Sequence, residues 1–107
     1  MLRHIYVRNT LEAIHSWPDA PEQVGFLRNE HRHLFFIKTT FKVDHNDRDK
    51  EFFIMQKRVR DFITHNYPMQ GDGYYRVQSC EQVAEDILAH FYLDGAVSCE
   101  VSEDAEN

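Results

Sequence analysis

The sequence predicts an α+β fold in which an antiparallel sheet carries two helices packed on one face. Two segments with an apolar residue at every second position flank a long loop near the start of the chain. Two segments with helical spacing follow, and a last alternating segment comes near the end. The resulting order is strand, strand, helix, helix, strand, and helices grouped between strands are typical of this class. With 107 residues, the chain is expected to form one domain over 1–107.

The first expected strand covers residues 2–16. Apolar residues recur at every second position from Val7 to Ala13, and polar residues such as Arg8 lie between them. Asn9 interrupts this alternation, so we expect a bulge or a polar pocket at that position.

The second expected strand covers residues 31–43 and has the clearest alternation in the chain. Phe35 and Ile37 share one face with His31 and His33. The opposite face mixes basic residues with Leu34 and Phe36 and is only half polar, so we expect other elements or another subunit to cover part of it. The segment between the two strands, residues 17–29, contains two Pro and one Gly without a period and is predicted to be a loop.

The first expected helix covers residues 50–65, where Phe52, Met55 and Val59 recur at helical spacing. Its N-cap is predicted to be Asp47 or Asp49, since a short carboxylate accepts hydrogen bonds from the first free amides of a helix.

The second expected helix begins after Ser79, which has Gln82 three residues further on, the spacing of a capping box. Gly95 is predicted to end it, because glycine adopts the left-handed conformation found after many helices. Residues 74–77 suit a short extended piece, and residues 96–103 alternate like a last strand before an acidic tail.

Composition and charge exclude several classes of partner. The formal net charge is −6, so the chain lacks the positive surface that binding to nucleic-acid phosphates requires. No apolar run is long enough for a membrane span or a signal peptide. Two cysteines, Cys80 and Cys99, are too few for a disulfide framework. We therefore expect a cytoplasmic protein without a membrane or nucleic-acid partner.

Three histidines are candidates for a metal site. His31 and His33 lie two residues apart on one strand face, with Cα atoms about 7 Å apart. If the first two strands pair as an antiparallel hairpin, His15 lies opposite His31. Three neutral imidazoles form the open site that catalytic Zn²⁺ uses. The plain alternative is that a chain with seven histidines brings some of them together by chance, as exposed or hydrogen-bonded residues.

Four short segments, in this order and with this approximate spacing, resemble the 6-pyruvoyl-tetrahydropterin synthase and 6-carboxy-tetrahydropterin synthase family. They are Leu11–His15, His31–His33, Ser79–Glu81 and Val101–Glu103, and together they extend over almost the whole chain. The resemblance implies the tunnelling fold, a ββααββ unit whose sheets join around a symmetry axis into a barrel. It also implies a homo-oligomer built from trimers, with a hexamer as the larger form, and active sites between subunits.

The same resemblance implies a function. The family's three zinc ligands match His15, His31 and His33. Zinc there acts as a Lewis acid on the substrate, and the activity is that of a carbon-oxygen lyase acting on a dihydroneopterin triphosphate-like substrate.

A pterin-like ligand would be held by residues near the end of the chain. Glu103 matches the family's glutamate that binds the guanidine-like edge of the pterin, as a carboxylate can do with two N–H donors. Ser79 and Cys80 match the pair that touches the pterin at the start of the second helix. The alternatives are a solvated carboxylate in an acidic tail, and an ordinary N-cap followed by a small buried cysteine.

The sequence also departs from the family's catalytic pattern. The family's proton-abstracting cysteine precedes the His-x-His pair, but residues 24–30 contain no cysteine, and Glu22 and Glu30 are the nearby carboxylates. His65 matches the catalytic histidine, with Thr64 in place of the partner aspartate, although a surface histidine at a helix C-terminus is the alternative. Arg32 replaces the glycine between the zinc ligands.

We also expect the family's last strand to have no counterpart in this sequence, whose last residue is Asn107. These departures favour a divergent member. A non-catalytic pterin-binding or assembly module is the second hypothesis, and a metal-free α+β domain of unrelated function is the third.

Overall fold

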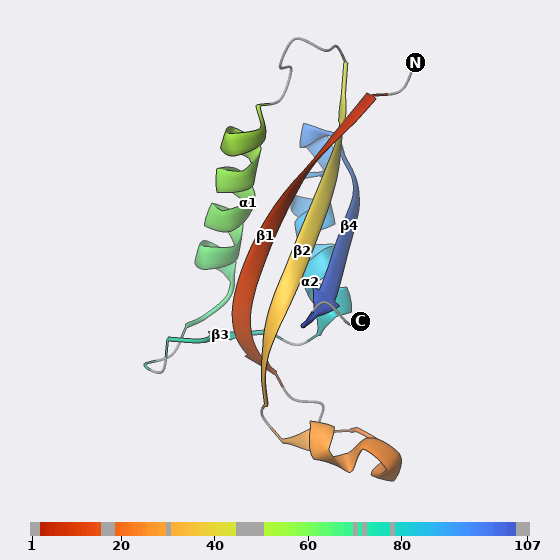
Figure 1. Cartoon of the computed structure of the whole chain (residues 1–107), viewed down its shortest axis with the longest axis vertical. Helices are drawn as coiled ribbons and strands as arrows, with labels where there is room; N and C mark the ends of the chain where they lie inside the picture. Colours follow the sequence, from red (N-terminus) through yellow and green to blue (C-terminus); the bar gives the residue numbers. More distant parts are fainter. Residues whose placement is uncertain are drawn as a thin grey trace.

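The computed structural model describes residues 3–15, 19–29, 31–44, 51–69, 71, 73–77 and 79–104, without the side chains of residues 15, 27, 28 and 31. Figure 1 shows the long strands crossing the molecule, with one helix to their left and the other behind them in this view. The elements, in chain order, are β1 (Arg3–His15), η1 (Glu22–Arg28), β2 (His31–Val43), α1 (Phe52–Asn66), β3 (Tyr75–Arg76), α2 (Cys80–His90), η2 (Tyr92–Asp94) and β4 (Ala96–Glu103).

The four strands form one sheet in the order β3-β1-β2-β4. β1 and β2 pair antiparallel along their whole length, and β4 pairs antiparallel with the other side of β2. β3 pairs parallel with β1, with Tyr75 opposite Ala13. The sheet is therefore mixed, and the prediction of an antiparallel sheet is wrong at this edge. The reason is that the chain turns back on itself after α1, where Met69 bridges to Tyr75, and so meets β1 in the same direction.

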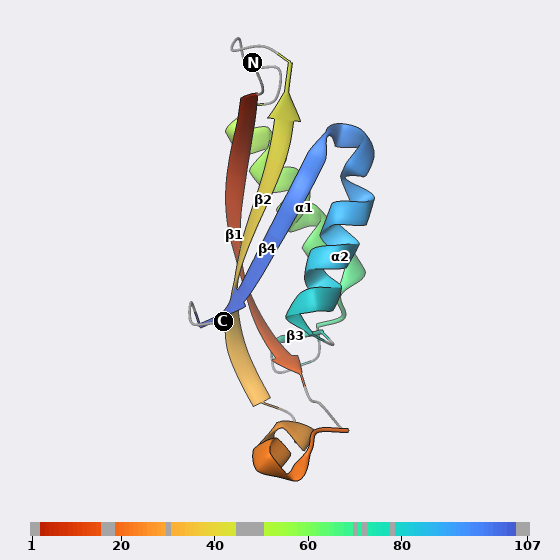
Figure 2. The same cartoon turned by 90° about the vertical axis from the view of Figure 1, so that its right-hand side faces the viewer.

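The core lies between one face of the sheet and both helices. Odd-numbered residues of β1 and β2 face the helices, as the period-2 pattern predicts, and Phe35, Ile37 and Phe41 are fully buried there. Val59 of α1 and Ile87 of α2 pack into the same cluster. Figure 2 shows both helices on the same side of the sheet, which confirms that part of the prediction. Burying each of these large side chains contributes about 1.5–3 kcal/mol.

The other face of the sheet stays open within one copy of the chain. Tyr6 and Phe36 are 47% and 37% exposed on that face. The cationic groups of Arg8 and Lys38 lie over the Tyr6 ring, 5.1 and 4.6 Å from its centroid. The Tyr6 ring is thus covered in part by two cationic groups of the same chain.

The start of α2 follows the sequence closely. Ser79 Oγ accepts a hydrogen bond of 3.1 Å from the Gln82 amide, as predicted for the N-cap. The Gln82 side chain does not complete a capping box, because it donates to Asp86 at 2.7 Å instead. The prediction that Gly95 ends this helix is wrong, because α2 ends at His90 with Phe91 as its C-cap. Gly95 adopts φ 91° and instead ends the short helix η2 that follows.

The N-cap of α1 differs from the prediction. Glu51 Oε2 accepts hydrogen bonds from the amides of Phe53 and Ile54 at 2.9 and 3.1 Å. Asp47 and Asp49 lie outside the described residues. The longer carboxylate takes over this role because it is the residue directly before the helix.

Two further expectations concern β1 and the loop after it. The register runs through Asn9 without a bulge, and Asn9 Nδ2 donates to the backbone carbonyl of Gln56 at 3.2 Å. The expected alternative, a polar pocket, is the one observed. The loop of residues 17–29 contains the 3₁₀ segment η1, which its aperiodic sequence does not predict.

Among the described residues, none of the helices has the length and apolar character to cross a membrane.

Candidate functional site

The backbone brings the three candidate metal ligands to one end of the sheet. His15 is the register partner of His31, and His33 is the partner of Ala13. Positions 15, 31 and 33 belong to the same face of the β1–β2 pair, because side chains alternate along each strand. The predicted approach of the two strand ends is thus confirmed at the level of the backbone. The side chains of His15 and His31 lie outside the described residues, so their joint binding of a metal stays a prediction.

The His33 ring is held in place by the residue that follows β4. Its Nδ1 lies 2.6 Å from Asp104 Oδ2, and the other carboxylate oxygen accepts the Leu34 amide at 3.0 Å. The Asp104 amide donates in return to the Leu34 carbonyl at 2.7 Å. Asp104 adopts φ 51°, a left-handed conformation that aspartate tolerates better than most residues. This turn directs the carboxylate back onto β2.

The Asp104 contact sets the chemistry of the His33 ring. The hydrogen bond from His33, followed by that from the Leu34 amide, lowers the pKa of Asp104. Asp104 is therefore an ionised acceptor near neutral pH, and Nδ1 of His33 carries the proton that it accepts. In a neutral imidazole the lone pair then belongs to Nε2. A carboxylate behind the ring is the usual way to prepare histidine Nε2 for a metal.

Glu103 lies on the Nε2 side of the same ring. Its Oε2 is 3.8 Å from His33 Nε2, and its Oε1 accepts a hydrogen bond from Cys80 Sγ at 3.6 Å. β4 places Glu103 directly opposite Phe35, whose odd-numbered position shares the face of His33. α2 begins at Cys80, beside the end of β4. One carboxylate thus connects the sheet to the start of the helix.

Cys80 is a thiol and not a thiolate. Burial, and then the nearby charge of Glu103, raise the pKa of Cys80 to about 12. A thiol with this pKa donates a hydrogen bond but does not remove a proton near neutral pH. Cys80 therefore does not replace the catalytic cysteine that the pterin synthase family carries before its His-x-His pair.

The structure brings together four of the residues that the sequence singles out. His33, Glu103 and Cys80 form a chain of contacts, and Ser79 adjoins them as the N-cap of α2. Asp104 is part of the same cluster and was missed, because in sequence it is one more acid in an acidic tail. The available clue is its position directly after an alternating strand, where aspartate often forms the turn.

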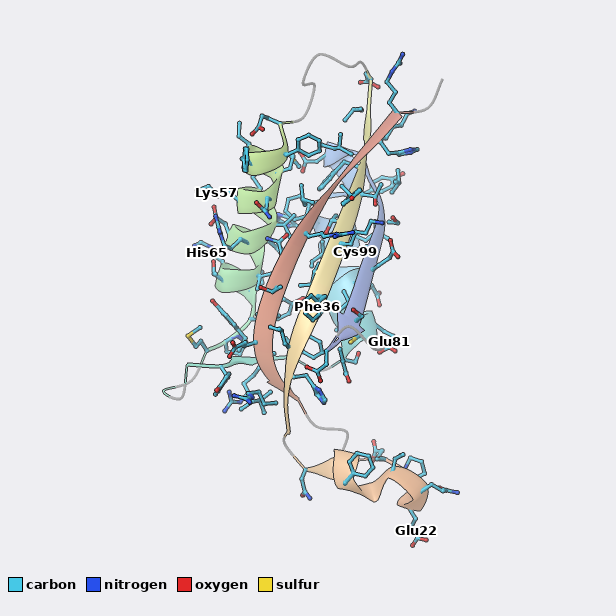
Figure 3. All side chains as sticks on the ribbon, viewed as in Figure 1. Glu22, Phe36, Lys57, His65, Glu81 and Cys99 are labelled. Carbon is cyan, nitrogen blue, oxygen red and sulfur yellow. The ribbon has the colours of Figure 1, made fainter. Side chains whose placement is uncertain are left out.

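His65 lies elsewhere, on the exposed surface of α1. Its Nδ1 donates to the Asp61 carbonyl at 2.6 Å, one turn earlier in the helix, and Thr64 Oγ1 is 3.5 Å from the same nitrogen. It lines a shallow cavity of about 290 Å³ together with His90. Figure 3 shows His65 on α1, well away from Glu81, which is the neighbour of Cys80 on α2. Within one copy of the chain, His65 does not join the cluster around Glu103.

Arg32 occupies the place of the family's glycine between the zinc ligands. Its guanidinium donates to the Tyr74 hydroxyl at 2.8 Å and lies 5.5 Å from the centroid of that ring. As an even-numbered residue, it belongs to the sheet face opposite His33. The substitution therefore leaves the histidine face of β2 unchanged.

Histidine side chains are common ligands of zinc ions. His33 has a carboxylate on Nδ1, and the register supplies His15 and His31 from the adjoining strand ends. Among the side chains that the structure describes, no group of three His, Cys, Asp or Glu residues could hold a metal ion. A site at this position thus needs His15 and His31 as well as His33.

Comparisons with known proteins add no family assignment. None of the protein-family models matches this chain, and a search of the curated proteins gives no match.

Proposed function

We propose that this protein is a divergent, zinc-binding member of the pterin synthase group, with His15, His31 and His33 as metal ligands and Glu103 as the anchor of a pterin-like ligand. The observation that supports it best is the β1–β2 register, which sets His15 opposite His31 with His33 on the same sheet face. The contact of Glu103 with His33 and Cys80 adds a ligand-binding carboxylate beside the proposed metal ligands.

Each group has a defined part in this proposal. The zinc ion, when bound, supplies Lewis acidity toward an oxygen of the ligand's side chain. Asp104 fixes the His33 ring through Nδ1. Glu103 accepts two N–H groups from the guanidine-like edge of a pterin, a bidentate and charge-assisted pair. Cys80, as a neutral thiol donor, orients the Glu103 carboxylate, and Ser79 holds the start of α2 beside it.

The proposed reaction, if the protein is a catalyst, is that of a carbon-oxygen lyase acting on a dihydroneopterin triphosphate-like substrate. His65 is the candidate acid-base residue, and in a single copy it lies apart from Glu103. Catalysis through His65 therefore needs an assembly in which α1 of one copy reaches the cluster of another. The tunnelling fold, with a trimer-based homo-oligomer, is the assembly that we propose, and the open aromatic face of the sheet is available for it.

A second candidate function is a pterin-binding or assembly module without turnover. The raised pKa of Cys80 favours it, since the one cysteine in the cluster stays protonated near neutral pH. The lyase and the pterin-binding module both require Glu103 to bind the pterin, and they differ only in whether the ligand is converted.

The test measures pterin binding and turnover on the zinc-loaded protein. We expect neopterin to bind with quenching of its own fluorescence, and Glu103→Gln to weaken the binding by about tenfold or more, because a charge-assisted bidentate pair is lost. Glu100→Gln is the matched control, since Glu100 is exposed on the same strand and pairs with Lys38 at 3.8 Å. Release of triphosphate from dihydroneopterin triphosphate distinguishes the lyase from the binding module. Absence of neopterin binding, or equal binding by both variants, would exclude the lyase and the pterin-binding module and leave the assembly module.

A further inference from the structure

A second site lies on the other side of the molecule, between α1 and the edge of β1. It is a cavity of about 610 Å³, a volume typical of small-molecule sites. None of its lining residues belongs to the His33–Glu103 cluster. The residues that matter for its chemistry are Asn9, Thr10, Leu11, Arg60, Ile63 and Thr64.

The cavity exists because the sheet is incomplete at this edge. β3 pairs with β1 only at Ala13 and Ile14, so in the described part of the chain no strand lies beside Thr10 on the side of β1 that faces away from β2. The backbone carbonyls of Arg8 and Ile14 both point to this edge. The Arg8 carbonyl accepts a hydrogen bond from Gln56 Nε2 at 2.7 Å, and the Ile14 carbonyl accepts one from the Val77 amide at 3.3 Å. By the alternation of a strand, the N–H and C=O of Thr10 point to the same edge. The cavity thus has a backbone donor in its wall.

Two arginines line the cavity, and one of them, Arg60, has no polar partner among the described residues. Gln56, Arg60 and Thr64 follow one another at intervals of four, so they form a row along one side of α1. The Gln56 side chain donates a hydrogen bond to the Arg8 carbonyl of β1, and Thr64 Oγ1 donates one to the Asp61 carbonyl. Among the described residues, Arg60 makes no hydrogen bond or ion pair, and the cavity lining contains no carboxylate. Arg8, the other arginine of the lining, has its guanidinium 5.1 Å from the Tyr6 ring centroid.

An unpaired acceptor lies in the same wall. Asn9 interrupts an otherwise apolar strand face, and its Nδ2 is bound to the Gln56 carbonyl at 3.2 Å. Its Oδ1 is buried and has no hydrogen-bond partner among the described residues. A buried acceptor without a donor is unfavourable, so a ligand that brings an N–H or O–H group relieves that cost. Leu11, Ile37 and Ile63 supply apolar wall around it.

We infer that this cavity binds a small monocarboxylate that carries an N–H donor and a hydrocarbon body, such as an N-acylated hydrophobic amino acid. The carboxylate pairs with the Arg60 guanidinium and the Thr10 amide, and the N–H donates to Asn9 Oδ1. The hydrocarbon body lies against Leu11 and Ile63. The Arg60 guanidinium, which has no carboxylate partner among the described residues, can form a charge-assisted pair with a carboxylate. The inference goes beyond the zinc and pterin proposal and uses none of its residues.

N-acetyl-L-leucine is the probe, and its binding is measured by two-dimensional amide NMR of the full chain. We expect saturable shifts centred on the amides of Thr10 and Thr64. Arg60→Gln should weaken the affinity by about tenfold or more, because the charge-assisted pair is lost. Lys57→Gln is the matched control, since Lys57 lies on the same helix but pairs with Asp61 at 3.0 Å, outside the cavity. It should bind like the wild type.

Two analogues of the probe test the individual groups. N-Acetyl-L-leucinamide lacks the carboxylate, and 4-methylpentanoate lacks the N–H donor, so each should bind at least several-fold more weakly than N-acetyl-L-leucine. The inference is overturned if N-acetyl-L-leucine gives no saturable shifts at these amides. It is overturned equally if Arg60→Gln binds the probe as well as Lys57→Gln does, or if both analogues bind as tightly as the probe.

Discussion

Asp104 is the residue on which the geometry of the candidate site depends most directly. It orients His33 through Nδ1 at 2.6 Å and ties the end of β4 to Leu34 through two further hydrogen bonds. His33, Glu103 and Cys80 could be predicted from the sequence, since each belongs to a short segment that resembles a known family. Asp104 could not, because its contact joins residues 71 positions apart and depends on the register of β4.

Replacing Asp104 tests its effect on metal binding. We expect Asp104→Asn to weaken zinc binding by about 10- to 100-fold, because the amide is a poorer acceptor behind the His33 ring. Affinity is measured by competition with a chromophoric chelator. Glu100→Gln, which removes an exposed charge from the same strand, should leave the affinity unchanged. Equal affinities for Asp104→Asn and the wild type would show that the carboxylate has no part in metal binding.

Tyr67 gives a prediction for stability at high pH. Burial, and then the hydrogen bond to Asp86 at 3.0 Å, raise the pKa of Tyr67 above its ordinary value of 10.0. Above pH 10 the unfolded chain therefore loses the phenol proton while the folded chain keeps it, so stability falls as pH rises. We expect the free energy of unfolding to fall more steeply with pH above 10 in the wild type than in Tyr67→Phe. Urea denaturation at several pH values measures this free energy. The same slope above pH 10 for the wild type and for Tyr67→Phe would contradict the expectation.

At the scale of elements, the long periodic segments are predictable, and residues 74–77 contain the expected short extended piece as β3, but the partner and direction of that strand are not predictable. β1 and β2 occupy nearly the predicted ranges, and Ser79 caps α2, because periodicity and cap chemistry are local properties. β3 has only two residues, too few for any periodic pattern, and its parallel direction depends on the path of the chain after α1. That short pairing leaves the edge of β1 open, and the second cavity lies at this edge.

Gly95 tests how the second helical segment is stopped. It adopts φ 91°, so we expect Gly95→Ala to lower the free energy of unfolding by about 1–2 kcal/mol, the cost of a left-handed conformation for a residue with a Cβ. Gly71→Ala is the matched control, because Gly71 has an ordinary φ and open space around its Cβ position. Urea denaturation of the two variants makes the comparison. Equal free energies of unfolding for the two variants would show that the left-handed conformation of Gly95 does not destabilise an alanine at this position.

At the scale of the whole molecule, both helices lie on one sheet face and leave the other face open. This arrangement follows from the sequence, since odd-numbered strand positions are apolar and the helices come between the strands. The open face keeps Tyr6 and Phe36 partly exposed beside several cations, on a chain whose net charge is −6. The assembly that we propose would cover this face, and light scattering on the purified protein gives the number of copies directly.

The three-histidine site is the central claim, and metal analysis of the purified, tag-free protein tests it most directly. We predict one equivalent of zinc per chain, lost in His15→Ala, His31→Ala and His33→Ala and kept in His65→Ala, whose ring lies on the surface of α1. Zinc that stays at one equivalent in the first three variants, or a wild type that binds none when zinc is supplied, would contradict the claim.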